Sequence, residues 1–353
     1  MFEYKFEKKN KKIAAFSLFN TLIKTKSKET LPISIDDYNF VFDNVLDKLN
    51  YLLKKKYKII IFISFIRNKN NSKALTYIKE IINNIFPFAY YFISTQNDIY
   101  KIPMCGLYIK FLKFNNSPSE IFYVGNNAGR ENDTNSDDIN FAYNCNIRFL
   151  TDTQFFLDRK ENVNVKLPAV CTSKVNSISD IELFTKNTTI IVMQGYPSSG
   201  KSTFINDYIN YYKLTNKYIV LPNHRDEPRM FAKKYKDALD QNKMIFIDYT
   251  NSSKEIRRKY FEILPSYYDA IGIRITTNKD LSYNLNKQRY YNSHTDPKYV
   301  SVLTDQKRRP NLSTKIYNRF DEIFEPMTKI EGFTKIYNYT PNVKLKYIFN
   351  KLS

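Results

Sequence analysis

Residues 188–204 read TTIIVMQGYPSSGKSTF, and this stretch decides the fold of the C-terminal half. An apolar run leads into a loop bounded by two glycines, which is followed by Lys-Ser and a helix-forming sequence. A strand, a glycine loop and a helix with this spacing form a P-loop, whose backbone N–H groups surround phosphate oxygens. The pattern predicts that Lys201 reaches the β- and γ-phosphates of ATP and that Ser202 ligates Mg²⁺. The predicted ATP-binding residues are Gly195, Ser198, Ser199, Gly200, Lys201, Ser202 and Thr203.

Glycine is scarce in this chain, and its placement is therefore informative. Only 7 of 353 residues are glycine, and Gly125, Gly129, Gly195 and Gly200 fall in two short loops. Glycine is needed where the backbone takes positive φ or approaches a ligand closely. This makes a chance match to the P-loop pattern a weak explanation and draws attention to the loop at 125–129.

Apolar runs alternate with amphipathic helical stretches along the whole chain, which is typical of parallel α/β sheets. A polar segment without clear periodicity separates two such series. We therefore expect an N-terminal domain at residues 1–158, a linker at 159–188 and a C-terminal domain at 189–353, a reasonable length for two domains.

The composition restricts the function classes. The formal charge of +20 favours a polyanionic partner such as nucleic acid, although a composition rich in Lys, Asn and Ile accounts for part of it. The three cysteines have no metal-ligand or disulfide spacing. The sequence shows no secretory signal and no membrane-length apolar run, so we expect an intracellular protein of nucleus or cytoplasm, with no membrane. Protein partners are unknown.

Two polar stretches beyond the P-loop are candidates for catalysis. Asp226 follows a predicted strand and could accept the proton of an attacking hydroxyl, while Arg229 could bind an acceptor phosphate. Arg289, on a polar helical stretch, could close over the ATP phosphates and stabilise transition-state charge. The alternatives are a charged surface loop around Asp226 and a solvated helix face around Arg289.

The run Met244–Asn251 resembles a Walker B strand ending in Asp248, whose carboxylate supports Mg²⁺. Thr250 and Asn251 follow and are candidates for substrate binding. The alternative is an ordinary N-terminal cap for the next helix, since Thr and Asn also suit that position.

In this order, these motifs resemble the polynucleotide kinase 3′-phosphatase family. The P-loop, Asp226, Asp248-Tyr-Thr-Asn251 and the terminal Phe-Glu-Pro and Glu-Gly-Phe segments look like its kinase half, with Tyr249 departing. Leu285 stands where a second lid arginine is expected. The resemblance implies a haloacid-dehalogenase (HAD)-like Rossmannoid parallel sheet followed by a P-loop NTPase-type parallel sheet. It also implies ATP and Mg²⁺ as cofactors and the 5′ ends of DNA or RNA as partner.

The first half looks like the family's phosphatase, but the residues that carry its chemistry are replaced. The nucleophilic and proton-donating aspartates fall on Ser17 and Phe19, in a stretch similar to Asp-x-Asp-Gly-Thr-Leu-Ile. A serine without an adjacent base is a poor nucleophile, and a phenyl ring cannot carry a proton. The remaining positions, a Ser/Thr, a Lys and a metal-binding Asp, fall on Ile63 (beside Ser64), Ile102 (beside Lys101) and Asn126.

The sequence therefore predicts an ATP-dependent polynucleotide 5′-hydroxyl kinase with a catalytically dead 3′-phosphatase-like domain. The competing hypotheses are a non-catalytic relic of an end-healing enzyme, kept for binding nucleic acid or protein, and a kinase of a small molecule. The intact Gly-Lys-Ser and Asp226 favour the enzyme.

Overall fold

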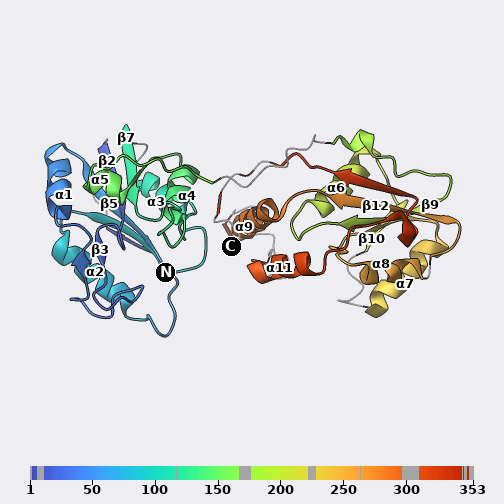
Figure 1. The fold of residues 1–353 in the computed structure, drawn as a ribbon, viewed down its shortest axis with the longest axis horizontal. Coiled ribbons are helices and arrows are strands. Elements are labelled where there is room, and N and C mark those ends of the chain that lie inside the picture. The colour runs from blue at the N-terminus through green and yellow to red at the C-terminus, as the bar shows by residue number, and fades with distance from the viewer. Residues whose placement is uncertain are drawn as a thin grey trace. The chain divides into compact units, whose positions relative to one another are not determined.

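The computed structural model describes residues 2–5, 12–115, 118–166, 176–221, 228–262, 264–295, 310–343, 345 and 348–349. Its described residues fall into two compact units. Among the described residues, the first contains those up to 166 with 291–295 and 348–349, and the second contains 176–290 with 310–343 and 345. Each unit has its own sheet (Figure 1) and its own buried core.

The N-terminal unit is built on a six-stranded sheet in the order β1-β6-β5-β2-β7-β8. Its strands β2, β5, β6, β7 and β8 are parallel, while β1 pairs antiparallel to β6. A two-stranded hairpin, β3 with β4, follows β2. The bounds are β1 Phe2–Lys5, β2 Lys12–Ser17, β3 Ile23–Lys24, β4 Asn39–Phe40, β5 Lys58–Ser64, β6 Tyr90–Ser94, β7 Glu120–Gly125 and β8 Arg148–Thr151.

Helices cover both faces of this sheet, because alternate residues of its central strands are apolar on either side. Ala14 and Phe16 of β2 pack with α1, α2 and α5, whereas Ile13 and Ala15 pack with α3 and α4. The bounds are α1 Val45–Lys54, α2 Ala74–Ile85, α3 Gly106–Asn115, α4 Asp137–Asn144 and α5 Asp152–Phe156.

The C-terminal unit holds a five-stranded, all-parallel sheet in the order β10-β11-β9-β12-β13. Helices α7 and α8 pack on one face, and α6 packs on the other. The strands are β9 Thr188–Gln194, β10 Tyr218–Leu221, β11 Met244–Ile247, β12 Tyr268–Ile275 and β13 Lys335–Tyr339. The helices are α6 Lys201–Tyr211, α7 Pro228–Asp240, α8 Lys254–Phe261, α9 Lys279–Thr295 and α11 Thr314–Glu322, with short 3₁₀ turns η1 Ile178–Asp180 and η3 Lys329–Glu331.

The α/β fold with two largely parallel sheets confirms the fold class expected from the sequence. The described parts of the segment 159–188 divide between the units: Glu161 bonds to Arg130 in the first, and Ile181 and Leu183 are buried in the core of the second. No helix in the described part of the chain is both long enough and apolar enough to cross a membrane.

Candidate active site

The glycine loop 195–200, which the sequence predicts to be a P-loop, joins β9 to α6. Ser198 and Gly200 take positive φ values of 60° and 110°. A Cβ atom at Gly195 would lie 2.9 Å from Ser199 Oγ and 3.1 Å from Ile275 O, so a side chain does not fit there. The loop therefore wraps closely around the start of α6, as a phosphate-binding loop must.

Lys201 and Ser202, in the first turn of α6, form hydrogen bonds with different parts of the site. Lys201 Nζ donates to Gly195 O at 2.9 Å and to Tyr196 O at 2.6 Å, so it lies over the loop. Ser202 Oγ donates to Asp248 Oδ2 at 2.6 Å, and Asp248 directly follows β11. A hydroxyl and a carboxylate side by side at the P-loop form a donor set that suits Mg²⁺.

The charge on Lys201 is sensitive to its surroundings. Burial lowers the pKa of Lys201 to about 8, although the Asp248 carboxylate acts in the opposite direction. The Arg289 charge lowers the pKa further, which places that guanidinium near the lysine. Lys201 and Arg289 thus bring positive charge to the glycine loop, a charge that favours an anionic ligand.

The remaining P-loop residues differ in exposure. Thr203 is exposed, whereas the Ser199 side chain is buried and its hydroxyl has no hydrogen-bond partner. Ser198 Oγ accepts from Asn286 Nδ2 at 3.3 Å, and Ser199 O accepts from Thr277 Oγ1 at 2.7 Å. A buried hydroxyl without a hydrogen-bond partner, such as that of Ser199, is consistent with a loop that binds an anion.

Helix α9 contacts the glycine loop through a hydrogen bond from the buried Asn286, in addition to the charge of Arg289. Asn286 bonds to Ser198, to Pro310 O and to the Leu312 N–H. Lys287 instead bonds to Asn311 and lies 4.8 Å from the centre of the Tyr283 ring. Helix α9 is therefore a partly buried wall of the site, and the solvated-face alternative does not describe it.

In the N-terminal unit, a pocket of about 170 Å³ lies at the ends of the strands. It lies at the carboxyl edge of β2 and β5, where parallel sheets commonly bind ligands. Phe19 is half-buried and packs against the core, and Ser17 ends β2. The lining residues are Ser17, Leu18, Phe19, Asn20, Phe62, Ile63, Ser64, Lys101, Ile102, Asn127, Asp137 and Asp138.

Two pairs of adjacent residues, Ile63 with Ser64 and Lys101 with Ile102, line this pocket. The side chains of Ile63 and Ile102 are buried in apolar clusters. Ser64 Oγ accepts from the Ile102 N–H at 3.0 Å, and Lys101 is half-buried at the pocket. The polar side chains at this edge of the pocket are therefore those of Ser64 and Lys101, next to the two isoleucines that the resemblance assigned to the Ser/Thr and Lys positions.

Asp138 is the buried carboxylate of this pocket. It accepts from Tyr123 Oη at 2.7 Å and from the Asn127 N–H at 3.0 Å. Burial raises the pKa of Asp138 to about 6, and these two hydrogen bonds oppose the shift. Asp138 is also why Gly125 has no side chain, since a Cβ atom there would lie 2.5 Å from the Asp138 Cβ.

Asn126 lies behind this pocket rather than among its lining residues. Its N–H donates to Thr21 Oγ1 at 3.1 Å, and its carbonyl accepts from Arg130 at 2.7 Å. Its side-chain oxygen is buried without a partner. In the described residues, no group of three or more His, Cys, Asp or Glu side chains is placed to hold a metal ion.

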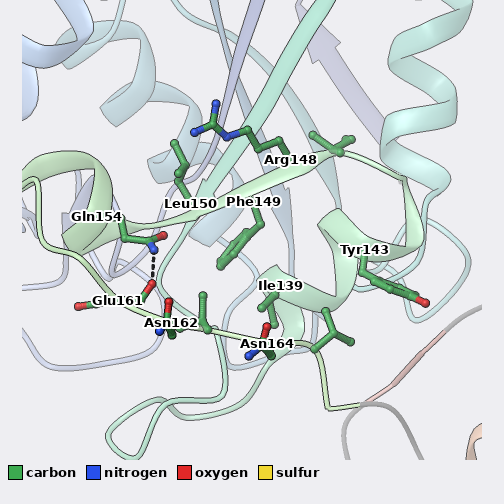
Figure 2. Close-up of a pocket in the computed structure, with 12 residues that line it drawn as sticks. Ile139, Tyr143, Arg148, Phe149, Leu150, Gln154, Glu161, Asn162 and Asn164 are labelled. Atoms are coloured by element: carbon green, nitrogen blue, oxygen red, sulfur yellow. Dashed lines mark hydrogen bonds between the residues drawn. The ribbon is translucent and has the colours of Figure 1, made fainter.

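A larger cavity of about 610 Å³ lies beside β8 in the same unit (Figure 2). Phe149 and Ile139 form apolar walls, and Gln154 donates to Glu161 O at 2.7 Å across one side. The Glu161 carboxylate is occupied by Thr151, Thr153 and Arg130. Glu161 is the one carboxylate among the described lining residues, and these bonds tie it to the wall of the cavity.

Comparison with known proteins identifies the family of this chain. A family model described as polynucleotide kinase 3 phosphatase matches residues 12–156. The bifunctional polynucleotide phosphatase/kinase of Schizosaccharomyces pombe is 31% identical over 352 residues, which cover 93% of this chain and 79% of the relative. The chain belongs to the polynucleotide kinase 3′-phosphatase family.

Two further relatives differ in how much of the chain they match. A putative bifunctional polynucleotide phosphatase/kinase of Acanthamoeba polyphaga mimivirus is 29% identical over 364 residues, covering 88% of this chain and 83% of the relative. The polynucleotide 3′-phosphatase ZDP of Arabidopsis thaliana is 28% identical over 171 residues, or 42% of this chain and 24% of that protein.

The family's C-terminal segments have a structural basis that sequence reasoning missed. Arg257 of α8 is fully buried and makes a two-pronged ion pair with Glu331, at 2.7 and 2.9 Å. It also donates to Asn251 O and Glu325 O, both at 2.9 Å. Burial raises the pKa of Glu331, but the bonds from Arg257 outweigh this and leave that pKa lowered. No local sequence signal marks Arg257, since it lies in a polar helix.

The predicted acceptor-binding residues lie in different environments. Arg229 is exposed in the first turn of α7, free to reach a phosphate. Asn251 is fully buried, so it does not contact a substrate in this structure. Thr250 is half-buried, and its carbonyl accepts from the Gly195 N–H at 3.2 Å. Asp226 lies outside the described residues.

Proposed function

We propose that this chain transfers the γ-phosphate of ATP to the 5′-hydroxyl end of a polynucleotide. The observation that carries the proposal is the contact between Ser202 and Asp248 at a P-loop whose lysine has Arg289 nearby. These four side chains come from three separate elements, α6, α9 and the segment after β11. Convergence of that kind is expected of a phosphoryl-transfer site.

Each of these residues has a role that its position supports. Ser202 and Asp248 would hold Mg²⁺, which when bound neutralises charge on the β- and γ-phosphates. Lys201 would leave the Gly195 and Tyr196 carbonyls and bind phosphate oxygens. Arg289 would face the charge that develops on the transferred group.

The acceptor would approach from the side of α7. Asp226, outside the described residues, is proposed as the base that takes the proton of the 5′-hydroxyl. Arg229 would bind the phosphate on the 3′ side of that nucleoside. The names of the full-length relatives and the +20 charge support a nucleic-acid acceptor.

We further propose that the N-terminal unit no longer hydrolyses 3′-phosphates. Ser17 has no carboxylate to form an aspartyl-phosphate, and the Phe19 ring cannot protonate a leaving group. Ser64, Lys101 and Asp138 line the same pocket, and they cannot supply the missing nucleophile and proton donor at positions 17 and 19 on their own.

Labelled ATP and 5′-hydroxyl DNA and RNA oligonucleotides provide the test, with Lys201→Ala as control. Label that requires Lys201 is expected on at least one polymer, and a chain that binds ATP yet labels neither polymer would refute the kinase. Comparing a nucleoside 3′-phosphate with a plain nucleoside as acceptor tests Arg229. The 3′-phosphate should lower KM in the wild type, and Arg229→Ala should remove that advantage while leaving KM for the plain nucleoside unchanged.

A further inference from the structure

The side chain of Asn251 lies where the two strands that carry the nucleotide site separate. The ladder between β11 and β9 ends at Ile247, which pairs with Val192. Beyond this pair, β9 continues into the P-loop and β11 continues into the segment that holds Asp248. Contacts between the two segments beyond this pair therefore determine the position of Asp248 relative to the glycine loop.

Asn251 makes that connection through its amide. Its Nδ2 donates to Met193 O of β9 at 2.5 Å, and lies 3.3 Å from Tyr249 O on its own side. Its side-chain oxygen accepts from Tyr260 Oη at 3.0 Å, which fixes the orientation of the amide. The side chain therefore adds a rung between the strands after the backbone ladder has ended.

The backbone around Asn251 strengthens the same connection. Thr250 O accepts from the Gly195 N–H at 3.2 Å, and Asn251 O accepts from Gln194 Nε2 at 3.1 Å. Asn251 has a φ of 45°, a left-handed conformation that asparagine tolerates better than most residues. Both the turn and the side-chain contacts therefore favour asparagine at this position.

We propose that Asn251 is a positioning residue, which holds the Asp248 carboxylate opposite the Ser202 hydroxyl and so determines metal-dependent nucleotide binding. The proposal rests on the proposed function for its metal and nucleotide. It replaces the role in substrate binding that the sequence suggested, because a fully buried side chain offers no surface to an acceptor.

Hydrogen exchange of the ligand-free protein tests the positioning alone. Asn251→Gly removes the amide and keeps the left-handed backbone free of strain. We expect faster exchange of the amides of residues 195–202 and 248–251. The control is Tyr268→Phe, which removes a buried hydroxyl near the Ala238 and Lys243 carbonyls and contacts no residue of the site. Unchanged exchange at 195–202 in Asn251→Gly would overturn the proposal.

Binding of a non-hydrolysable ATP analogue, with and without Mg²⁺, tests the consequence. Outer-shell partners of metal ligands typically affect metal affinity by about 10–100-fold. Asn251→Gly should therefore lose about tenfold or more of the affinity gained from Mg²⁺, with little change when Mg²⁺ is absent. An equal gain from Mg²⁺ in both proteins contradicts the proposal, as does a variant that raises only KM for the acceptor.

Two precautions keep the outcomes separable. If Asn251→Gly does not fold, Tyr260→Phe removes only the hydroxyl that orients the amide and should give a smaller change in the same direction. An analogue that fails to bind the wild type overturns the proposed function and the metal part of this inference. The exchange experiment still decides whether Asn251 holds the loop.

Discussion

Arg257 and Glu331 form a two-pronged ion pair inside the C-terminal unit, although 74 positions separate them in the chain. The Arg257 side chain is 0% exposed and that of Glu331 is 11% exposed. The pair joins α8 to η3, and the bond from Arg257 to Asn251 O extends it to the nucleotide site. The stability of the unit and the geometry of the site therefore depend on the same residue.

We expect Arg257→Met to destabilise the C-terminal unit by about 3–5 kcal/mol, because it leaves a largely buried carboxylate without its partner. Hydrogen exchange of the β9 and β12 amides measures the free energy of unfolding of this unit separately from that of the N-terminal unit. The control is the neighbouring Arg258→Ala, which removes an exposed ion pair with Glu262 and should cost less than about 0.5 kcal/mol. Equal losses in both variants would contradict the importance of burial.

The lowered pKa of Lys201 gives a pH dependence to nucleotide binding. Burial holds this pKa at about 8, so the lysine in the ligand-free protein loses its proton as pH rises through that value. Phosphate binding favours the charged form, and binding must then take up a proton. We expect ATP affinity to fall about tenfold between pH 7 and pH 9.

Lys201→Arg is the matched variant for this prediction, because arginine stays charged over the whole range. Its affinity should be weaker at neutral pH and independent of pH between 7 and 9. Calorimetric titration in two buffers of different ionisation enthalpy would detect the proton uptake directly. A wild-type affinity that is flat over this range argues against a depressed lysine pKa.

Arg289→Ala should lower kcat by about 10²–10³-fold with little change in KM for the oligonucleotide, since the guanidinium acts on transition-state charge. Lys287→Ala is the control on the same helix, because Lys287 is occupied by Asn311 and the Tyr283 ring. Steady-state phosphate transfer measures both. An effect of Arg289→Ala confined to KM would place this residue on the acceptor instead.

The wild-type chain should release no phosphate from 3′-phosphorylated oligonucleotides, and Ser17→Ala should change nothing. Restoring one group is not enough, because attack, leaving-group protonation and metal binding need separate residues. We expect measurable release only from the combined Ser17→Asp, Phe19→Asp and Asn126→Asp variant. Wild-type release that disappears in Ser17→Ala would reveal a serine-dependent chemistry.

The strand, glycine loop and helix around residues 195–202, and the place of Asp248 beside them, could be expected from the sequence because their signals are local. Gly195 to Ser202 is one continuous motif, and Asp248 directly follows a short apolar strand. The bond between Ser202 and Asp248 follows from parallel neighbouring strands, whose carboxyl ends lie at one edge of the sheet.

Other features need the folded chain. Adjacent strand residues face opposite sides of the sheet, so the sequence does not say which of Ile63 and Ser64 is the one that packs in the apolar core, as Ile63 does. The burial of Asn251 and the pairing of Arg257 with Glu331 arise from contacts between distant segments. From the sequence alone, an asparagine or arginine that stabilises the fold cannot be distinguished from one that binds a ligand.

The pocket that contains Ser17 and Phe19 has a consequence for the history of the chain. A phosphatase of this kind must crowd several carboxylates beside Asp138, and like charges at close range destabilise the folded state. Serine and phenylalanine relieve that repulsion, and Phe19 adds apolar packing against the core. With the proposed loss of hydrolysis, uncharged side chains at these two positions stabilise the folded state, and restoring aspartates there would cost folding free energy.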